Sequence, residues 1–112
     1  MSTGPLAGLT ALDLSRVLSG PYCTMQLADM GARVIKIEHP HRGDDTRAWG
    51  PPFVKDLEGK DADAAYFMCT NRGKKSLTLD IAKPEGQAII RELRAVSDFE
   101  FEFQLALMKR RR

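Results

Sequence analysis

One stretch, residues 9–38, most constrains how this chain of 112 residues can fold. An apolar run over 9–14 predicts a buried strand, and a second run over 33–38 predicts another. Residues 21–30 between them are typical of a helix, with Ser19 as its predicted N-cap. Strand–helix–strand units of this kind normally place their strands parallel, with a right-handed crossover. The predicted fold class is therefore α/β.

The turn that joins the first strand to the helix is the first candidate binding site. Ligands of open α/β sheets bind at the carboxyl ends of the strands, where this turn lies. Gly20 permits close approach of a backbone or a ligand, and the free N–H groups at a helix start favour an anion, phosphate above all. The alternative is an ordinary α/β connection. The G-x-G-x-x-G spacing of a dinucleotide site does not occur in this turn.

Composition excludes several other classes of function. Seventeen Lys and Arg face 15 Asp and Glu, and residues 109–112 supply much of the small basic excess, so we expect no nucleic-acid partner. Cys23 and Cys69 show no metal-ligand spacing, which indicates a reducing compartment and no metal site, and Cys23 is expected in the core. With no bilayer-length apolar run and no targeting pattern, the expected location is cytoplasmic, without membrane contact.

A long polar connection, residues 39–60, follows the second strand. Its length is typical of loops that face ligands. Asp44 or Asp45 is predicted to cap a short turn within it. Residues 64–70 are apolar and fit either a helix or an extended segment.

The remaining pattern predicts one more strand and one more helix. The basic turn over 71–75 is expected to be solvated, and alternation over 76–81 predicts a strand. Pro84 opens a helix whose apolar stripe contains Ile89, Ile90, Leu93 and Val96. Residues 98–104 alternate Phe with polar side chains, so they could pair as a strand, but an exposed Phe stripe is also an aggregation liability.

Several short motifs, in this order along the chain, resemble the N-terminal part of the class III CoA-transferases, which include formyl-CoA and carnitine-CoA transferases. The motifs are GPLAGL (4–9), LDLSRVLSGPY (12–22), LADMGA (27–32), VIKIE (34–38), GDDTR (43–47), NR (71–72), KKS (74–76), LDI (79–81) and KPEG (83–86). The variant DDTRAWGPPF (44–53) looks most like the members that move CoA between dicarboxylates such as succinate and glutarate.

The resemblance implies a partial Rossmann-like open sheet from the N-terminal part of a family domain in which two subunits interlock as a homodimer. Residues 1–98 would form that part. Residues 99–112 depart from the family pattern and are expected to be a divergent tail, outside the family fold.

The resemblance also implies coenzyme A, bound as an acyl-CoA substrate, and no metal. The expected CoA-binding positions are Val17, Leu18, Ser19, His39, Leu79, Asp80, Ile81 and Ala82. His39 takes the place of a basic residue that contacts the adenosine part in the family.

In the family a carboxylate attacks an acyl-CoA thioester, and an enzyme-bound aspartyl- or glutamyl-CoA then passes CoA to an acceptor acid. The family nucleophile is an Asp well beyond residue 112, so we expect this chain to be a truncated member that is inactive alone. Asp13 and Asp80 are expected to be structural. Two alternatives remain: a fragment related to acyl-CoA racemases, and a non-catalytic nucleotide-binding, CoA-binding or interaction domain.

Overall fold

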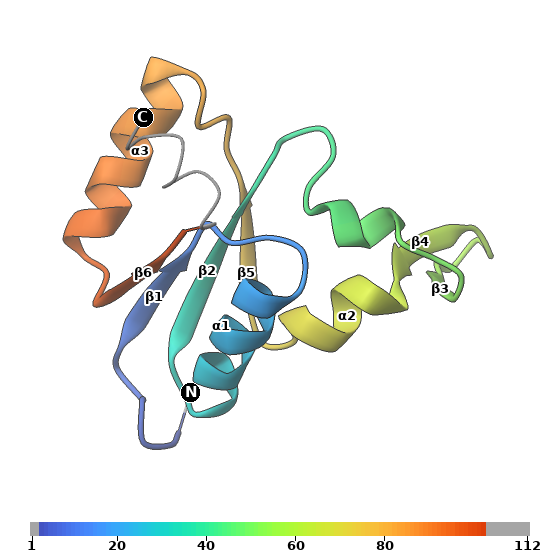
Figure 1. Cartoon of the computed structure of the whole chain (residues 1–112), viewed down its shortest axis with the longest axis horizontal. Helices are drawn as coiled ribbons and strands as arrows, with labels where there is room; N and C mark the ends of the chain where they lie inside the picture. Colours follow the sequence, from blue (N-terminus) through green and yellow to red (C-terminus); the bar gives the residue numbers. More distant parts are fainter. Residues whose placement is uncertain (1–2, 103–112) are drawn as a thin grey trace.

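The computed structural model describes residues 3–102, and its centre is a four-stranded parallel sheet (Figure 1). The strands are β1 (Thr10–Asp13), β2 (Arg33–Glu38), β5 (Lys75–Thr78) and β6 (Phe99–Phe101). They lie in the order β5-β2-β1-β6, and each neighbouring pair is parallel. In chain order this is 3-2-1-4, the arrangement in which the connections change direction beside the first strand.

Two helices cover the sheet. Helix α1 (Ser19–Asp29) joins β1 to β2, and α3 (Pro84–Ala95) joins β5 to β6. The two connections run in opposite directions across the sheet, so right-handed crossovers place their helices on opposite faces. We call these the α1 face and the α3 face.

The α3 face holds one cluster of buried apolar side chains. Leu12, Ile37 and Ile90 are buried against one another. The half-buried side chains packed around them are Leu14, Ile35, Leu79 and Leu93. Because side chains alternate along a strand, residues 11 and 13 of β1 and 34, 36 and 38 of β2 lie on the α1 face. That face therefore carries the buried charged side chains of Asp13, Lys36 and Glu38 together with the buried apolar side chains of Ala11 and Val34.

The connection from β2 to β5 contains its own small elements, which stand away from the sheet at one side (Figure 1). It comprises the 3-10 helix η1 (Asp45–Ala48), the antiparallel pair β3 (Phe53–Lys55) and β4 (Asp61–Ala64), and helix α2 (Ala65–Asn71). Helix α2 brings the chain back against α1 before β5 begins.

Most of the expected elements are confirmed, including the strand over 33–38, the Asp44 cap and the helix that Pro84 opens. Ser19 is not the N-cap of α1; Leu18 occupies that position, without a side-chain cap bond, and Ser19 is already helical. Cys23 is exposed rather than buried, because it lies on the solvent side of α1. The third expected strand is shorter than predicted and runs only through Thr78.

The expected tail falls partly inside the sheet. Residues 99–101 form β6, which pairs with β1, whereas residues 103–112 lie outside the described part of the chain. The proposed boundary between residues 98 and 99 stays a prediction.

Candidate functional site

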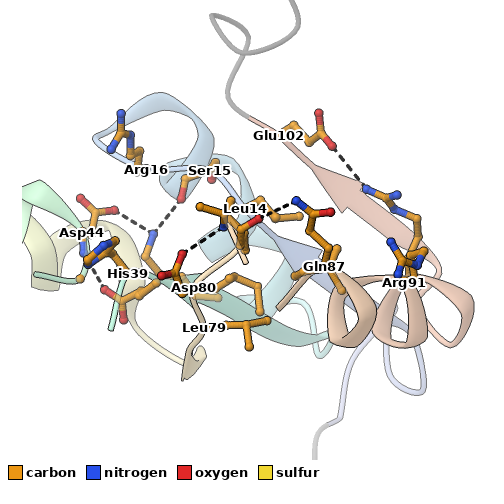
Figure 2. Close-up of a pocket in the computed structure, with 18 residues that line it drawn as sticks. Leu14, Ser15, Arg16, His39, Asp44, Leu79, Asp80, Gln87, Arg91 and Glu102 are labelled. Atoms are coloured by element: carbon orange, nitrogen blue, oxygen red, sulfur yellow. Dashed lines mark hydrogen bonds and ion pairs between the residues drawn. The ribbon is translucent and has the colours of Figure 1, made fainter. Parts of the chain in front are cut away.

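A pocket of about 810 Å³ lies at the carboxyl ends of β1 and β2, between the loop after β5 and helix α3 (Figure 2). Leu14, Ser15 and Arg16 close one side, and Gln87, Ile90 and Arg91 of α3 close another. Its position next to the reversal of strand order, between β1 and β6, is where open α/β sheets bind ligands.

Five of the eight residues expected from the resemblance line this pocket. They are His39, Leu79, Asp80, Ile81 and Ala82. Val17, Leu18 and Ser19 are not among the lining residues and lie in the adjoining turn and the start of α1. The structure places Ser15 and Arg16 at the wall instead, along with residues of α3 that the sequence analysis did not select.

The turn after β1 is bound tightly to its surroundings. Asp13 Oδ1 accepts hydrogen bonds from the amide of Ser15 at 2.8 Å and from the Ser15 hydroxyl, and Asp13 Oδ2 accepts one from Thr24 at 2.6 Å. Gly20 is packed against Ser15, where an added Cβ would stand 2.4 Å from the Ser15 Cβ. The expected structural role of Asp13 agrees with these contacts.

Two buried lysines pair with the carboxylates beneath this turn. Lys36 Nζ lies 2.8 Å from Asp44 Oδ2, and Lys74 Nζ lies 3.1 Å from Asp13 Oδ2. Lys74 also donates to the Pro21 carbonyl and to Asn71, both at 2.9 Å. Burial lowers the pKa of Lys74, and the charge of Asp13 opposes that effect. The expectation of a solvated basic turn is therefore wrong for Lys74.

Glu38 forms a second charged centre at the end of β2. It accepts bonds from Arg47 at 2.8 and 2.7 Å, from the Asp44 amide at 2.8 Å, and from the Ser76 hydroxyl. Burial acts to raise its pKa, but the bonds from Arg47, Ser76 and Asp44 outweigh burial and lower the pKa of Glu38 to about 2. The guanidinium carbon of Arg47 also lies 3.7 Å from the centroid of the Phe67 ring, and Arg47 donates hydrogen bonds to Asp63. Arg47 therefore links the long connection between β2 and β5 to the end of β2.

The wall formed by residues 79–82 depends on close packing against α3. Asp80 Oδ1 accepts a bond from the amide of Ala82 at 3.0 Å, and Gln87 donates to the Ile81 carbonyl at 3.3 Å. Gly86 lies so close that an added Cβ would stand 2.0 Å from the Asp80 carbonyl oxygen. Only glycine therefore permits this approach of helix and loop.

Within residues 3–102 there is no group of three or more His, Cys, Asp or Glu side chains placed to hold a metal ion. Each helix in the same range is too short or too polar to cross a bilayer.

The chain is similar to known proteins over most of its length. It is 52% identical over 98 residues to succinate–glutarate CoA-transferase of Agrobacterium fabrum, which covers 88% of this chain and 24% of that protein. It is 52% identical over 94 residues to human succinyl-CoA:glutarate CoA-transferase, covering 84% of this chain and 20% of that protein. The chain thus spans about a quarter or less of the length of these relatives.

The fold agrees with these sequence matches. The crystal structure of a CAIB/BAIF family protein from Brucella suis superposes with a TM-score of 0.83 at 46% identity, over 96% of this chain and 28% of that one. Residues 6–102 match the sequence profile of CoA-transferase family III, a range that includes every expected site residue and β6. The chain therefore belongs to CoA-transferase family III.

Proposed function

We propose that residues 3–102 form part of the coenzyme A site of an enzyme that moves CoA from an acyl-CoA to a carboxylic acid. The observation that carries this proposal is the pocket of about 810 Å³, which brings together His39 and residues 79–82 from separate parts of the chain. The family resemblance independently selects those positions for CoA. The apolar side chains Leu14, Ile37 and Ile90 suit the adenine ring, and polar groups at the rim suit the phosphates.

The acceptor and donor acids are proposed to be dicarboxylic. Relatives at 50–52% identity are named for succinate with glutarate, in Agrobacterium fabrum, mouse and human. The motif over 44–53 points to the same members of the family. The residues that recognise the second carboxylate are proposed to lie outside residues 3–102.

The carboxylates of the pocket wall are proposed to be structural rather than nucleophilic. Glu38 is bonded to Arg47, and Asp44 is paired with Lys36, so an attack on a thioester would first require breaking a buried ion pair. Asp80 holds the Ala82 amide, and Glu102 is paired with Arg94. The attacking carboxylate is then supplied from beyond the described residues, and residues 3–102 bind and orient CoA without performing the transfer alone.

We further propose that the complete enzyme is a cytoplasmic homodimer. Exposed apolar side chains, including Tyr22, Trp49, Tyr66 and Met68, are consistent with further covering of this part of the fold.

A urea unfolding experiment with and without millimolar CoA tests the proposal. A ligand that binds only the folded state raises its stability, by about 1.4 kcal/mol at a tenfold excess over Kd. We expect the midpoint to rise with CoA. Ala82→Trp, which fills the pocket, is expected to abolish the rise, whereas Ala62→Trp on the exposed strand β4 is expected to keep it. An unchanged wild-type midpoint, or an equal response in Ala82→Trp, would contradict the proposal.

A further inference from the structure

The turn between β1 and α1 contains an unusual backbone conformation. Val17 has φ of +75°, and it is the one non-glycine residue with positive φ among those described. Branching at Cβ makes this region particularly unfavourable for valine, at a cost of about 1–3 kcal/mol. Such a conformation persists only when its surroundings fix it. The contacts of the turn must therefore hold Val17 in this conformation.

Charged side chains from three separate elements bind the backbone of this turn. Asp13 accepts from the Ser15 amide at 2.8 Å. Lys36 of β2 donates to the Ser15 carbonyl at 3.0 Å, and Asp44 Oδ1 accepts from the Val17 amide at 3.4 Å. The backbone on both sides of Arg16 is thus bonded to buried side chains, and Arg16 itself is one of the residues that line the pocket. Figure 2 shows Ser15 and Asp44 each bonded on this side of the pocket.

Lys36 and Asp44 are also each other's charged partners. Their side chains are 2% and 0% exposed, and 2.8 Å separates Nζ from Oδ2. Asp44 is itself fixed by Thr46, whose amide and hydroxyl bond its Oδ1 at 3.0 and 2.8 Å. A buried pair of this kind often adds little net stability over an apolar replacement, because desolvation offsets the attraction. The hydrogen bonds of Lys36 and Asp44 are directional, however, and they fix the two backbone groups of the turn that they join.

We propose that Lys36 and Asp44 are positioning residues that hold residues 15–17 in the conformation that forms one wall of the pocket. They act through the turn, by bonding the Ser15 carbonyl and the Val17 amide. The identity of the ligand rests on the proposed function above; the control of the turn does not.

The test uses the double variant Lys36→Met/Asp44→Asn of the full chain, which removes both charges at nearly constant volume. The matched control is Asp29→Asn/Arg72→Met, which removes an ion pair of 2.7 Å between exposed side chains away from the pocket. Two quantities are measured: amide hydrogen exchange of Ser15 and Val17 by NMR, and the Kd for CoA by calorimetry. The Ser15 amide is an internal reference, because its acceptor Asp13 is unchanged.

We expect the double variant to exchange the Val17 amide about tenfold faster or more relative to Ser15, and to bind CoA about tenfold more weakly, the equivalent of about 1.4 kcal/mol. The control should keep both values within about twofold. The more conservative double variant Lys36→Gln/Asp44→Asn also removes both charges but keeps two side-chain amides that can bond to each other, so an intermediate effect is expected, and it replaces Lys36→Met/Asp44→Asn if that one does not fold.

Unchanged Val17 exchange would overturn the proposal, as would a variant that is less stable but binds CoA with wild-type Kd. If the wild-type chain binds no CoA, the proposed function fails, and the ratio of Val17 to Ser15 exchange alone decides whether the pair controls the turn.

Discussion

The two faces of the sheet are both buried, but different interactions bury them. On the α3 face, Leu12, Ile37 and Ile90 pack without polar partners. On the α1 face, Asp13, Lys36 and Glu38 are equally inaccessible, and each is bonded to a named partner from another element. Both faces contribute residues to the same pocket.

The difference indicates separate roles for the two faces. Apolar packing is non-directional and stabilises in proportion to the area removed from water. Buried ion pairs add less net stability, but they fix geometry and fail severely when one partner is removed. We therefore infer that apolar packing, which on the α1 face includes Ala11 and Val34, mainly supplies stability, whereas the charged side chains of the α1 face mainly fix the shape of the pocket wall.

The largest effect is expected on the α1 face, from Lys74→Met. This change leaves Asp13 buried without its cation and should lower the free energy of unfolding by about 3–5 kcal/mol. Urea unfolding at neutral pH measures it. The double variant Lys74→Met/Asp13→Asn removes both charges and should recover much of the loss. If the double variant lost as much stability as Lys74→Met and Asp13→Asn added together, the two side chains would not be acting as a pair.

On the α3 face, Ile90→Ala should cost about 2–4 kcal/mol, because it deletes buried methyl and methylene groups and leaves a cavity beside Leu12 and Ile37. Urea unfolding measures the loss, and Ile89→Ala is the matched control because Ile89 is 41% exposed. Equal losses of stability in Ile90→Ala and Ile89→Ala would contradict the placement of Ile90 in the buried apolar cluster.

Acid should distinguish the faces through Glu38. The folded-state pKa of Glu38 is lowered from 4.5 to about 2, so the unfolded chain binds this proton more tightly. Its stabilisation is complete above the unfolded pKa and is lost as pH falls from about 4.5 towards about 2, an effect of about 2–3 kcal/mol. Unfolding midpoints at about pH 6 and pH 3 should show a smaller acid loss for Glu38→Gln than for wild type, whereas Ile90→Ala should show the wild-type loss. Identical losses in Glu38→Gln and wild type would refute the assignment.

The smallest effect is expected for an ion pair outside the sheet. Lys55 and Asp61 bridge β3 and β4 with side chains 62% and 54% exposed. Asp61→Asn should therefore change the free energy of unfolding by less than about 1 kcal/mol, less still at high salt. If Asp61→Asn lowered the free energy of unfolding as much as Lys74→Met does, buried and exposed ion pairs would not differ as expected.

The elements that the sequence predicted are those whose signal is local. Apolar runs identified β1 and β2, and the helical period of the apolar residues identified α3. Asp44 was one of two candidate caps, with Asp45, and it bonds Thr46 two residues later. The resemblance selected residues 79–82, which do lie together in the pocket wall. Whether they bind CoA stays a prediction.

The features that the sequence did not predict arise from distant contacts. Lys74 is bonded to Asp13, 61 residues away, and to the Pro21 carbonyl, so its side chain is buried against β1 and α1, whereas Arg72, Gly73 and Lys75 of the same turn are exposed as expected. The hairpin of β3 and β4 is short and polar, and no period marks it. Cys23 faces solvent because the short α1 buries only one side, chiefly Pro21, Thr24 and Met25.

The most direct test of the account is an NMR titration of the full chain with CoA that follows every backbone amide. If the pocket is the CoA site, saturable shifts are concentrated at residues 14–17, at His39, at residues 79–82 and in the first turns of α3, with little change in the hairpin of β3 and β4. Shifts confined to another surface, such as the hollow between Tyr22, Met30 and Arg72, or no saturable shifts at all, would contradict it.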